Sequence, residues 1–143
     1  MSDKLWFQTQ YAGRTAEQAV ARWFRRRGWR PFAACGSEAF DLLLMTKIEV
    51  KHDLAAPATG HVAIEVESRG RPSGIVTSQA DYWVLVFAEQ AVVVRTSTLR
   101  ERVLAGGLRR QDCGEDGSTV VCLLPVDQLV QLAGAQWIEL GEG

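Results

Sequence analysis

Short strand-like segments separated by turns make up most of the chain after residue 30, and they restrict the fold more than any other feature. Alternating polar and apolar residues, or runs of β-branched and aromatic residues, predict strands at residues 30–34, 39–45, 47–52, 61–67, 82–87, 91–95, 119–124 and 136–140. Residues 88–90 are expected to turn a hairpin. These strands must pair within one chain of 143 residues, which is the size of a single domain.

Helical periodicity is clearest in "TAEQAVARWFRRRG", residues 15–28, where apolar side chains recur every three or four positions and a glycine follows. Shorter helices are predicted at residues 76–80, at 98–104, where Thr98 and Glu101 have the spacing of a capping box, and at 125–132. The order of elements predicts an α/β or α+β domain over residues 1–143, with a central mixed β-sheet flanked by helices.

Composition narrows the class of protein. No apolar run reaches the length of a membrane span, and residues 1–30 do not have the pattern of a secretory signal. The three cysteines are odd in number and form no C-x-x-C pair, which disfavours a disulfide framework and a zinc site. We therefore expect a cytoplasmic protein with reduced thiols and no membrane partner.

Positive charge is concentrated between residues 14 and 30, in and around the predicted first helix, although the net charge of the chain is only −1. A basic helix on a neutral protein suits contact with a polyanion such as DNA along one face. A solvated helix face without a ligand explains the same charges equally well. The arginines concerned are Arg14, Arg22, Arg25, Arg26, Arg27 and Arg30.

Charged residues interrupt two of the predicted strands. Side chains alternate across a strand, so Glu49 and Lys51 share one face of residues 47–52, and Glu65 lies on one face of residues 61–67. If these strands are neighbours, their acids can meet Asp41 at one edge of the sheet, and Glu17 can join them from the helix. Carboxylate oxygens gathered in this way suit Mg²⁺ or Mn²⁺. An exposed Glu–Lys strand face without a function is the plainer alternative.

The ordered set of Gly13 to Glu17, Asp41 and "EVK" at residues 49–51 resembles the PD-(D/E)xK nuclease superfamily, in which the layout is similar to archaeal Holliday-junction resolvases and small phage-type endonucleases. The segment "TGHVAIEVESRGRPSGIVTSQADYWVLVF" is similar to a segment of phage-encoded nucleases. The resemblance covers about residues 10–95. Phe40 stands where the superfamily has its proline, and Gln79 stands where the phage-type pattern has a lysine.

The resemblance implies a restriction-endonuclease-like core that cuts DNA with Mg²⁺ or Mn²⁺. It implies that Asp41, Glu49 and the Val50 carbonyl hold the metal, that Lys51 is the catalytic lysine, and that Glu17 is an outer ligand or an orienting acid. Gln79 would lie near the site, and Glu65 would be a further acid of unassigned role. Ser73 is a candidate phosphate contact, although turn chemistry explains it as well.

Three functions stay open from the sequence. The leading one is a Mg²⁺-dependent DNA endonuclease that acts on branched or structured DNA in recombination, repair or phage replication, in a bacterium or a phage-infected host. A symmetric junction cutter would need two copies, which leaves a homodimer open. The alternatives are a non-enzymatic DNA-binding module on the same fold and an interaction protein whose arginine helix is only a polar face.

Overall fold

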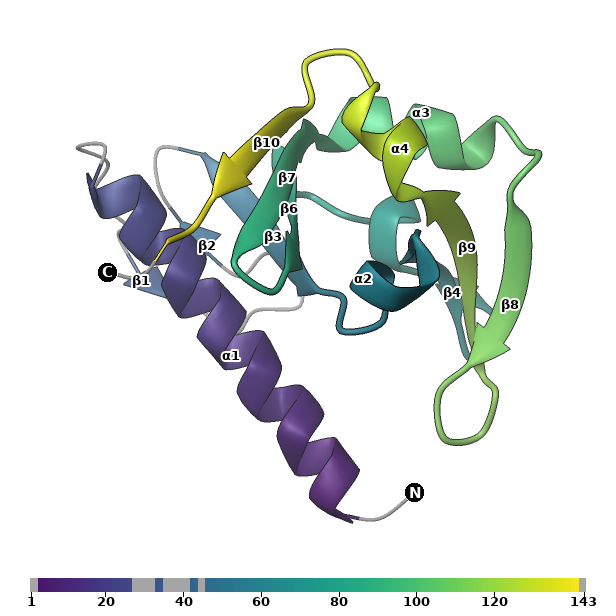
Figure 1. Ribbon diagram of the computed structural model, residues 1–143. Coiled ribbons are helices and arrows are strands. Elements are labelled where there is room, and N and C mark those ends of the chain that lie inside the picture. Colours follow the sequence, from purple (N-terminus) through teal and green to yellow (C-terminus); the bar gives the residue numbers. More distant parts are fainter. Residues whose placement is uncertain (1–2, 27–32, 35–41, 44–45, 142–143) are drawn as a thin grey trace.

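Two β-sheets and one long helix dominate the computed structural model, which describes residues 3–26, 33–34, 42–43 and 46–141 (Figure 1). The first sheet has the strand order β1 (Ala33–Ala34), β2 (Leu42–Leu43), β3 (Lys47–His52), β6 (Tyr82–Phe87), β7 (Gln90–Arg95) and β10 (Gln136–Glu139). The second has the order β5 (Arg71–Pro72), β4 (His61–Ser68), β9 (Thr119–Pro125) and β8 (Arg109–Cys113). The helices are α1 (Asp3–Arg26), α2 (Ala56–Thr59), the 3-10 turn η1 (Gly74–Val76), α3 (Thr96–Leu104) and α4 (Val126–Val130).

The first sheet is the mixed sheet that the sequence predicts. Strands β3 and β6 are parallel, whereas the other neighbours in this sheet are antiparallel. Asp81 makes two hydrogen bonds to Lys47 at the start of the parallel pair. Its backbone N–H donates to the Lys47 carbonyl at 2.8 Å, and its carboxylate accepts from the Lys47 N–H at 2.9 Å. The predicted strand 47–52 and the hairpin of β6 and β7 are confirmed, with a turn one residue shorter than expected because β7 begins at Gln90.

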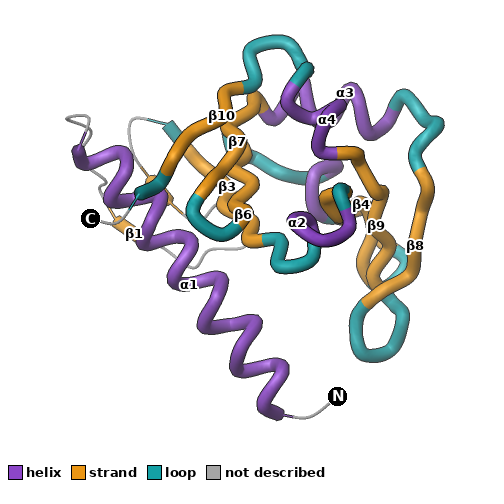
Figure 2. The backbone as a smooth tube through the Cα atoms, viewed as in Figure 1, coloured by secondary structure: helices purple, strands orange, loops and turns teal. Residues whose placement is uncertain are grey.

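Helix α1 covers one face of this sheet. Ala16, Val20 and Ala21 are buried against Ile48 and Val50 of β3 and against the buried residues of β6, β7 and β10 on the same face. The helix begins at Asp3, well before the predicted start at residue 15, and its first turns extend past the edge of the sheet (Figure 2). In the part of the helix whose side chains the structure describes, an apolar stripe packs on the sheet.

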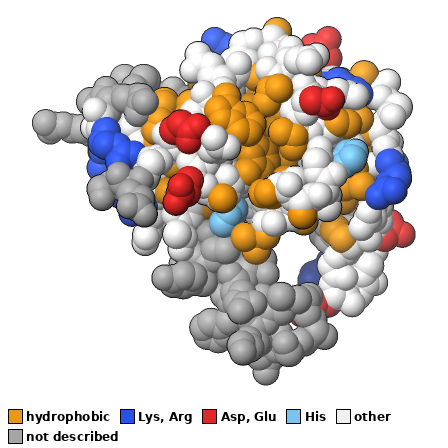
Figure 3. Space-filling view, in the orientation of Figure 1, with side chains coloured by type: hydrophobic (Ala, Val, Ile, Leu, Met, Phe, Trp, Pro, Cys, Tyr) orange, Lys and Arg blue, Asp and Glu red, His pale blue; other side chains and the backbone are white. Residues whose placement is uncertain are grey.

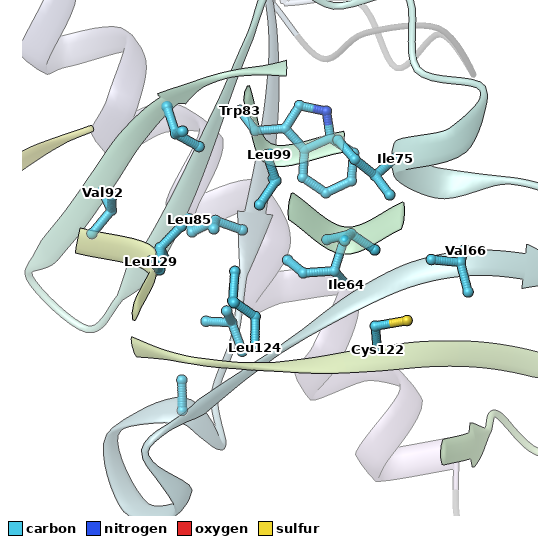
Figure 4. Packing of buried hydrophobic residues seen from close by; sticks show 14 of the residues in the cluster. Ile64, Val66, Ile75, Trp83, Leu85, Val92, Leu99, Cys122, Leu124 and Leu129 are labelled. Atoms are coloured by element: carbon cyan, nitrogen blue, oxygen red, sulfur yellow. The ribbon is translucent and has the colours of Figure 1, made fainter. Parts of the chain in front are cut away.

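The second sheet covers the opposite face of the first. Its inward side chains, among them Ile64 and Leu124, pack with Trp83 and Leu85 of β6, and α3 and α4 close the cluster (Figure 4). The condition on which Glu65 could meet the acids of β3, that β3 and β4 are neighbours, is not met, because β4 pairs with β9 and β5 in the second sheet. The domain thus has three layers, in the order α1, first sheet and second sheet.

Two smaller expectations are also wrong. Helix α3 begins at Thr96 without a side-chain cap, and the backbone N–H of Thr96 donates to the Asp81 carbonyl at 3.0 Å, so the capping box at Thr98 does not start this helix. Strand β8 occupies the first part of a segment, residues 111–118, that reads as a loop from its polar composition. Alternation fails to reveal β8 because four of its five residues are exposed.

Candidate active site

Two charged residues of β3, Glu49 and Lys51, form an ion pair. Lys51 Nζ lies 2.6 Å from Glu49 Oε1, on the face of β3 that points away from α1. The Glu49 side chain is 13 % exposed and that of Lys51 is 46 % exposed. A carboxylate so nearly buried needs a compensating partner, and Lys51 supplies one from two residues along the strand. The prediction that the two side chains share one face is confirmed.

The indole ring of Trp83 lies next to this ion pair, under the Lys51 ammonium. Trp83 lies opposite Glu49 in the parallel register, is 1 % exposed, and has its ring centroid 5.7 Å from Lys51 Nζ. The indole Nε1–H donates to Ser78 Oγ at 3.0 Å. From the sequence, Trp83 is expected to be a core residue, which its burial confirms, and neither Trp83 nor Ser78 is predicted to belong to the site. One sequence signal could have pointed to them. Ser78 lies five positions before Trp83, just ahead of a predicted strand, and a hydroxyl there can reach an indole N–H.

Asp41 lies outside the described residues. Its neighbour Leu42 pairs with Ile48 in the antiparallel register of β2 and β3, and Ile48 is the residue before Glu49. The last described pair in this direction, Leu42 with Ile48, thus consists of the residue after Asp41 and the residue before Glu49. The prediction that Asp41 and Glu49 act together stays a prediction.

Glu17 lies on α1, which packs on the face of β3 that carries Ile48 and Val50, whereas Glu49 and Lys51 lie on the other face of the strand. Phe24 and Ile48 line one groove at the start of β3. Glu17 precedes Phe24 by two helical turns, or about 10 Å, and α1 runs in the opposite direction to β3 (Figure 1). Glu17 is half-buried, and its action together with Glu49 stays a prediction.

Glu65 is not brought to Glu49. It lies on β4 in the second sheet, on the face opposite Ile64 and Val66, whose side chains fill the core between the sheets. Its Oε1 accepts a hydrogen bond from Ser73 Oγ at 2.7 Å. The expected convergence of Glu65 with the β3 acids is therefore wrong. The Ser73 hydroxyl, predicted as a phosphate contact, is already used by this carboxylate.

Gln79 is exposed in the loop between η1 and β6, two residues before Asp81. It makes no hydrogen bond within the part of the chain that the structure describes. Across the same ranges, no group of three or more His, Cys, Asp or Glu side chains is placed to hold a metal ion. A metal site at β3 therefore depends on residues beyond the described set, Asp41 first.

The arginines of α1 differ in their surroundings. Arg22, Arg25 and Arg26 are exposed near the end of the helix, where Figure 3 shows Lys and Arg side chains gathered. Arg26 Nη2 donates to the Leu140 carbonyl, so this side chain anchors the end of β10. Arg22 lines a shallow groove that also contains the acid Glu89. The side chain of Arg14 is outside the described residues.

Comparison with known proteins supports the fold and gives no family. Scans against protein-family models and against curated proteins give no match. The solved structure of a bacterial homing endonuclease, I-Ssp6803I, superposes with a TM-score of 0.51 and 16 % sequence identity, over 84 % of this chain and 80 % of that one. In the described ranges, no helix has the length and apolar character required to traverse a lipid bilayer. The chain thus has the mixed α/β architecture of a restriction-endonuclease-like fold.

Proposed function

We propose that this protein is a metal-dependent DNA endonuclease whose active site is built on β3. The observation that carries the proposal is the Glu49–Lys51 pair, at 2.6 Å, on a strand of the mixed sheet. Two further observations support it. The fold is shared with a structure described as a homing endonuclease, and the order Glu17, Asp41, Glu49, Lys51 resembles the PD-(D/E)xK pattern.

The proposed cofactor is Mg²⁺ or Mn²⁺. Glu49 suits such an ion because its carboxylate is a hard oxygen donor and its side chain is 13 % exposed. One carboxylate does not hold a hard cation against water, so the proposed ligands are Glu49, the Val50 carbonyl and Asp41, with Glu17 as an outer acid. Glu65 is left out, because it lies on the second sheet. When bound, the ion would neutralise phosphate charge and lower the pKa of a bound water.

The proposed reaction is hydrolysis of a phosphodiester. A water oxygen forms a bond to phosphorus and one P–O ester bond breaks, which leaves a phosphomonoester end and a hydroxyl end. The leaving oxygen takes one proton and the second is released to solvent. Lys51 would hold its ammonium beside the phosphate, where negative charge increases in the transition state. A half-exposed lysine can turn from Glu49 to a phosphate because its four-carbon stem is flexible.

The finer features of the proposal rest on the resemblance. They are a branched or structured DNA substrate, a role in recombination, repair or phage replication, a homodimer for a symmetric junction, and a cytoplasmic location. The free thiols of Cys113 and Cys122 agree with that location. Gln79 is proposed to contact substrate, since its side chain is exposed beside the start of β6.

A cleavage assay tests the proposal. Linear, nicked, flap and four-way DNA are each incubated with the wild type in Mg²⁺, Mn²⁺ or EDTA. We expect cuts with either metal, none with EDTA, and the fastest cleavage on a branched substrate. Glu49→Gln should abolish cutting, whereas Glu65→Gln, the matched change on the second sheet, should preserve it. A wild type that binds DNA but cuts none of these substrates would leave the non-enzymatic DNA-binding module as the function.

A further inference from the structure

The segment that joins the two sheets, residues 73–81, is fastened at both ends. Gly74 has φ +57°, and a Cβ there would lie 2.2 Å from the backbone oxygen of Glu65, so only glycine fits this close approach to β4. At the other end Asp81 is bonded to Lys47 and, through its carbonyl, to Thr96. The middle of the segment is therefore held in a set position between the sheets.

Ser78 is the centre of this segment and is bonded on two sides. Its hydroxyl accepts from Trp83 Nε1–H at 3.0 Å and from the Ala80 N–H at 3.3 Å. Its carbonyl accepts from Arg100 Nη2 at 2.7 Å, while Arg100 Nε donates to the Ile75 carbonyl at 2.8 Å. Arg100 thus fixes the backbone of Ser78, and Ser78 fixes the rotation of the Trp83 ring.

The fixed ring then lies against the ammonium of Lys51, at 5.7 Å from its centroid. A cation is attracted to the face of an indole at this distance. The ring is a neutral partner, so it restricts the ammonium without cancelling the charge that a phosphate would need. The carboxylate of Glu49 restricts the same group but neutralises it.

We infer that Trp83, held by Ser78, is a positioning residue for the Lys51 ammonium. The inference rests on the proposed function, because it assigns Trp83 a part in catalysis through Lys51. Trp83 touches neither substrate nor metal in this scheme. It keeps the ammonium over one place on β3, so that the charge is in position when a phosphate arrives.

A spectroscopic test reports the contact without any cleavage. Lys4, Lys47 and Lys51 are the lysines of the chain, so reductive ¹³C-methylation gives few NMR signals, and Lys51→Arg identifies the signal of Lys51. The ring current should displace that signal to higher field than those of Lys4 and Lys47. Trp83→Leu should remove the displacement and Ser78→Ala should reduce it. An unchanged Lys51 signal in a folded Trp83→Leu protein would overturn the inference.

A kinetic test separates positioning from a purely structural role. Ser78→Ala should lower the single-turnover cleavage rate about tenfold without changing DNA affinity, because a weakened ring contact misplaces the ammonium. Ser78→Thr keeps the hydroxyl and should restore the rate, and Ser97→Ala, at an exposed position of α3, should have no effect. If Trp83→Leu fails to fold, Trp83→Phe replaces it in the NMR test. This variant keeps a smaller ring but loses the bond to Ser78, so the displacement of the Lys51 signal should shrink, and an unchanged signal would overturn the inference.

The outcomes distinguish the two proposals. Lower stability of Ser78→Ala with an unchanged rate for the folded molecules would overturn the positioning role and leave the nuclease in place. A wild type that cuts no DNA would overturn the nuclease and the catalytic part of the inference. The NMR displacement would then decide alone whether the ring holds Lys51.

Discussion

Strands β3 and β4 have similar sequences and different chemistry. Each contains the pattern of a glutamate between apolar residues, as "KIEVKH" in β3 and "HVAIEVES" in β4. In β3, Glu49 is paired at 2.6 Å with a lysine from its own strand. In β4, Glu65 accepts a hydroxyl from Ser73, and Glu67 lies 4.0 Å from Arg110 of β8. The pattern of charge along a strand does not by itself distinguish a site from a structural contact.

The partner of each acid makes the difference. Lys51 is half-exposed and flexible, so under the proposed function its ammonium can turn from Glu49 to a phosphate once a bound cation compensates the nearly buried carboxylate. Ser73 is held by its own N–H, which donates to the Val66 carbonyl at 3.0 Å, so its bond to Glu65 is part of the fold. Under the proposed function, Glu49 is the reactive acid with an exchangeable partner, and Glu65 is a structural acid with a fixed one.

The largest expected effect separates the two strands by activity. Lys51→Arg keeps the charge but spreads it over a longer planar group. We expect it to retain fold and DNA binding and to lose cleavage by about two to three orders of magnitude. Glu65→Gln should cut DNA at the rate of the wild type. Single-turnover cleavage and DNA affinity, measured on the same samples, check both. Full activity of Lys51→Arg would remove the lysine from the mechanism.

The next effect concerns which layer of the molecule binds DNA. Arg22 and Arg25 are exposed on α1, the layer beside β3, whereas Arg109 and Arg110 are exposed on β8 of the second sheet. If α1 contacts phosphates, each arginine replaced by alanine should flatten the log–log salt dependence of binding by roughly 0.9. The double variant on β8 is the matched control. Equal losses from both pairs would mean that binding is not specific to the α1 layer.

A smaller effect is expected on stability, and here β4 is the sensitive strand. Ser73→Ala removes the partly buried hydrogen bond to Glu65 and should lower the free energy of unfolding by about 1–2 kcal/mol. Glu67→Gln removes an exposed ion pair at 4.0 Å and should cost no more than about 0.5 kcal/mol. Urea unfolding measures both. A larger loss from Glu67→Gln would reverse the assignment of which β4 acid is structural.

The smallest effect is a change in thiol reactivity. Burial raises the pKa of Cys113, and the negative charges of Glu65 and Asp112 raise it further. Glu65→Gln should therefore lower this pKa toward its ordinary value, so that more thiolate is present at a given pH and alkylation is faster. Alkylation rates across pH, in a Cys35→Ser background, follow the change. Glu49→Gln is the control, and an equal shift from it would argue that Glu49 and Glu65 are close after all.

Much of the local structure could be predicted, because it depends on neighbours in sequence. The bounds of β3 and the hairpin of β6 and β7 follow from alternation and from a short turn. The second sheet could not be predicted in this way. Periodicity identifies the apolar face of β4 but not the strand beside it, and β9, its partner, is more than fifty residues further along the chain.

In the candidate site, too, the local arrangement could be predicted from the sequence and the contacts between strands could not. Alternation alone predicts that Glu49 and Lys51 share a face, and the structure confirms it. The sequence analysis assigns no site role to Trp83, because that role depends on the parallel register of β3 with β6 and on a loop that brings Ser78 to the ring. Glu65 is expected near Glu49 only if the consecutive strands β3 and β4 are neighbours. Strand pairing again depends on the tertiary structure, which places these two strands in different sheets.

The link between Lys47 and Asp81 has a consequence for folding kinetics. It closes a separation of 34 residues, and the chain between the two contains β4, β5 and η1. Loop closure of this length is slower than formation of the local hairpin of β6 and β7, so the parallel pair should assemble late. Lys51 and Trp83 meet only when that pair forms. We expect a partly folded chain to have its β6–β7 hairpin but not its candidate active site, so that any nuclease activity would appear only with the last phase of folding.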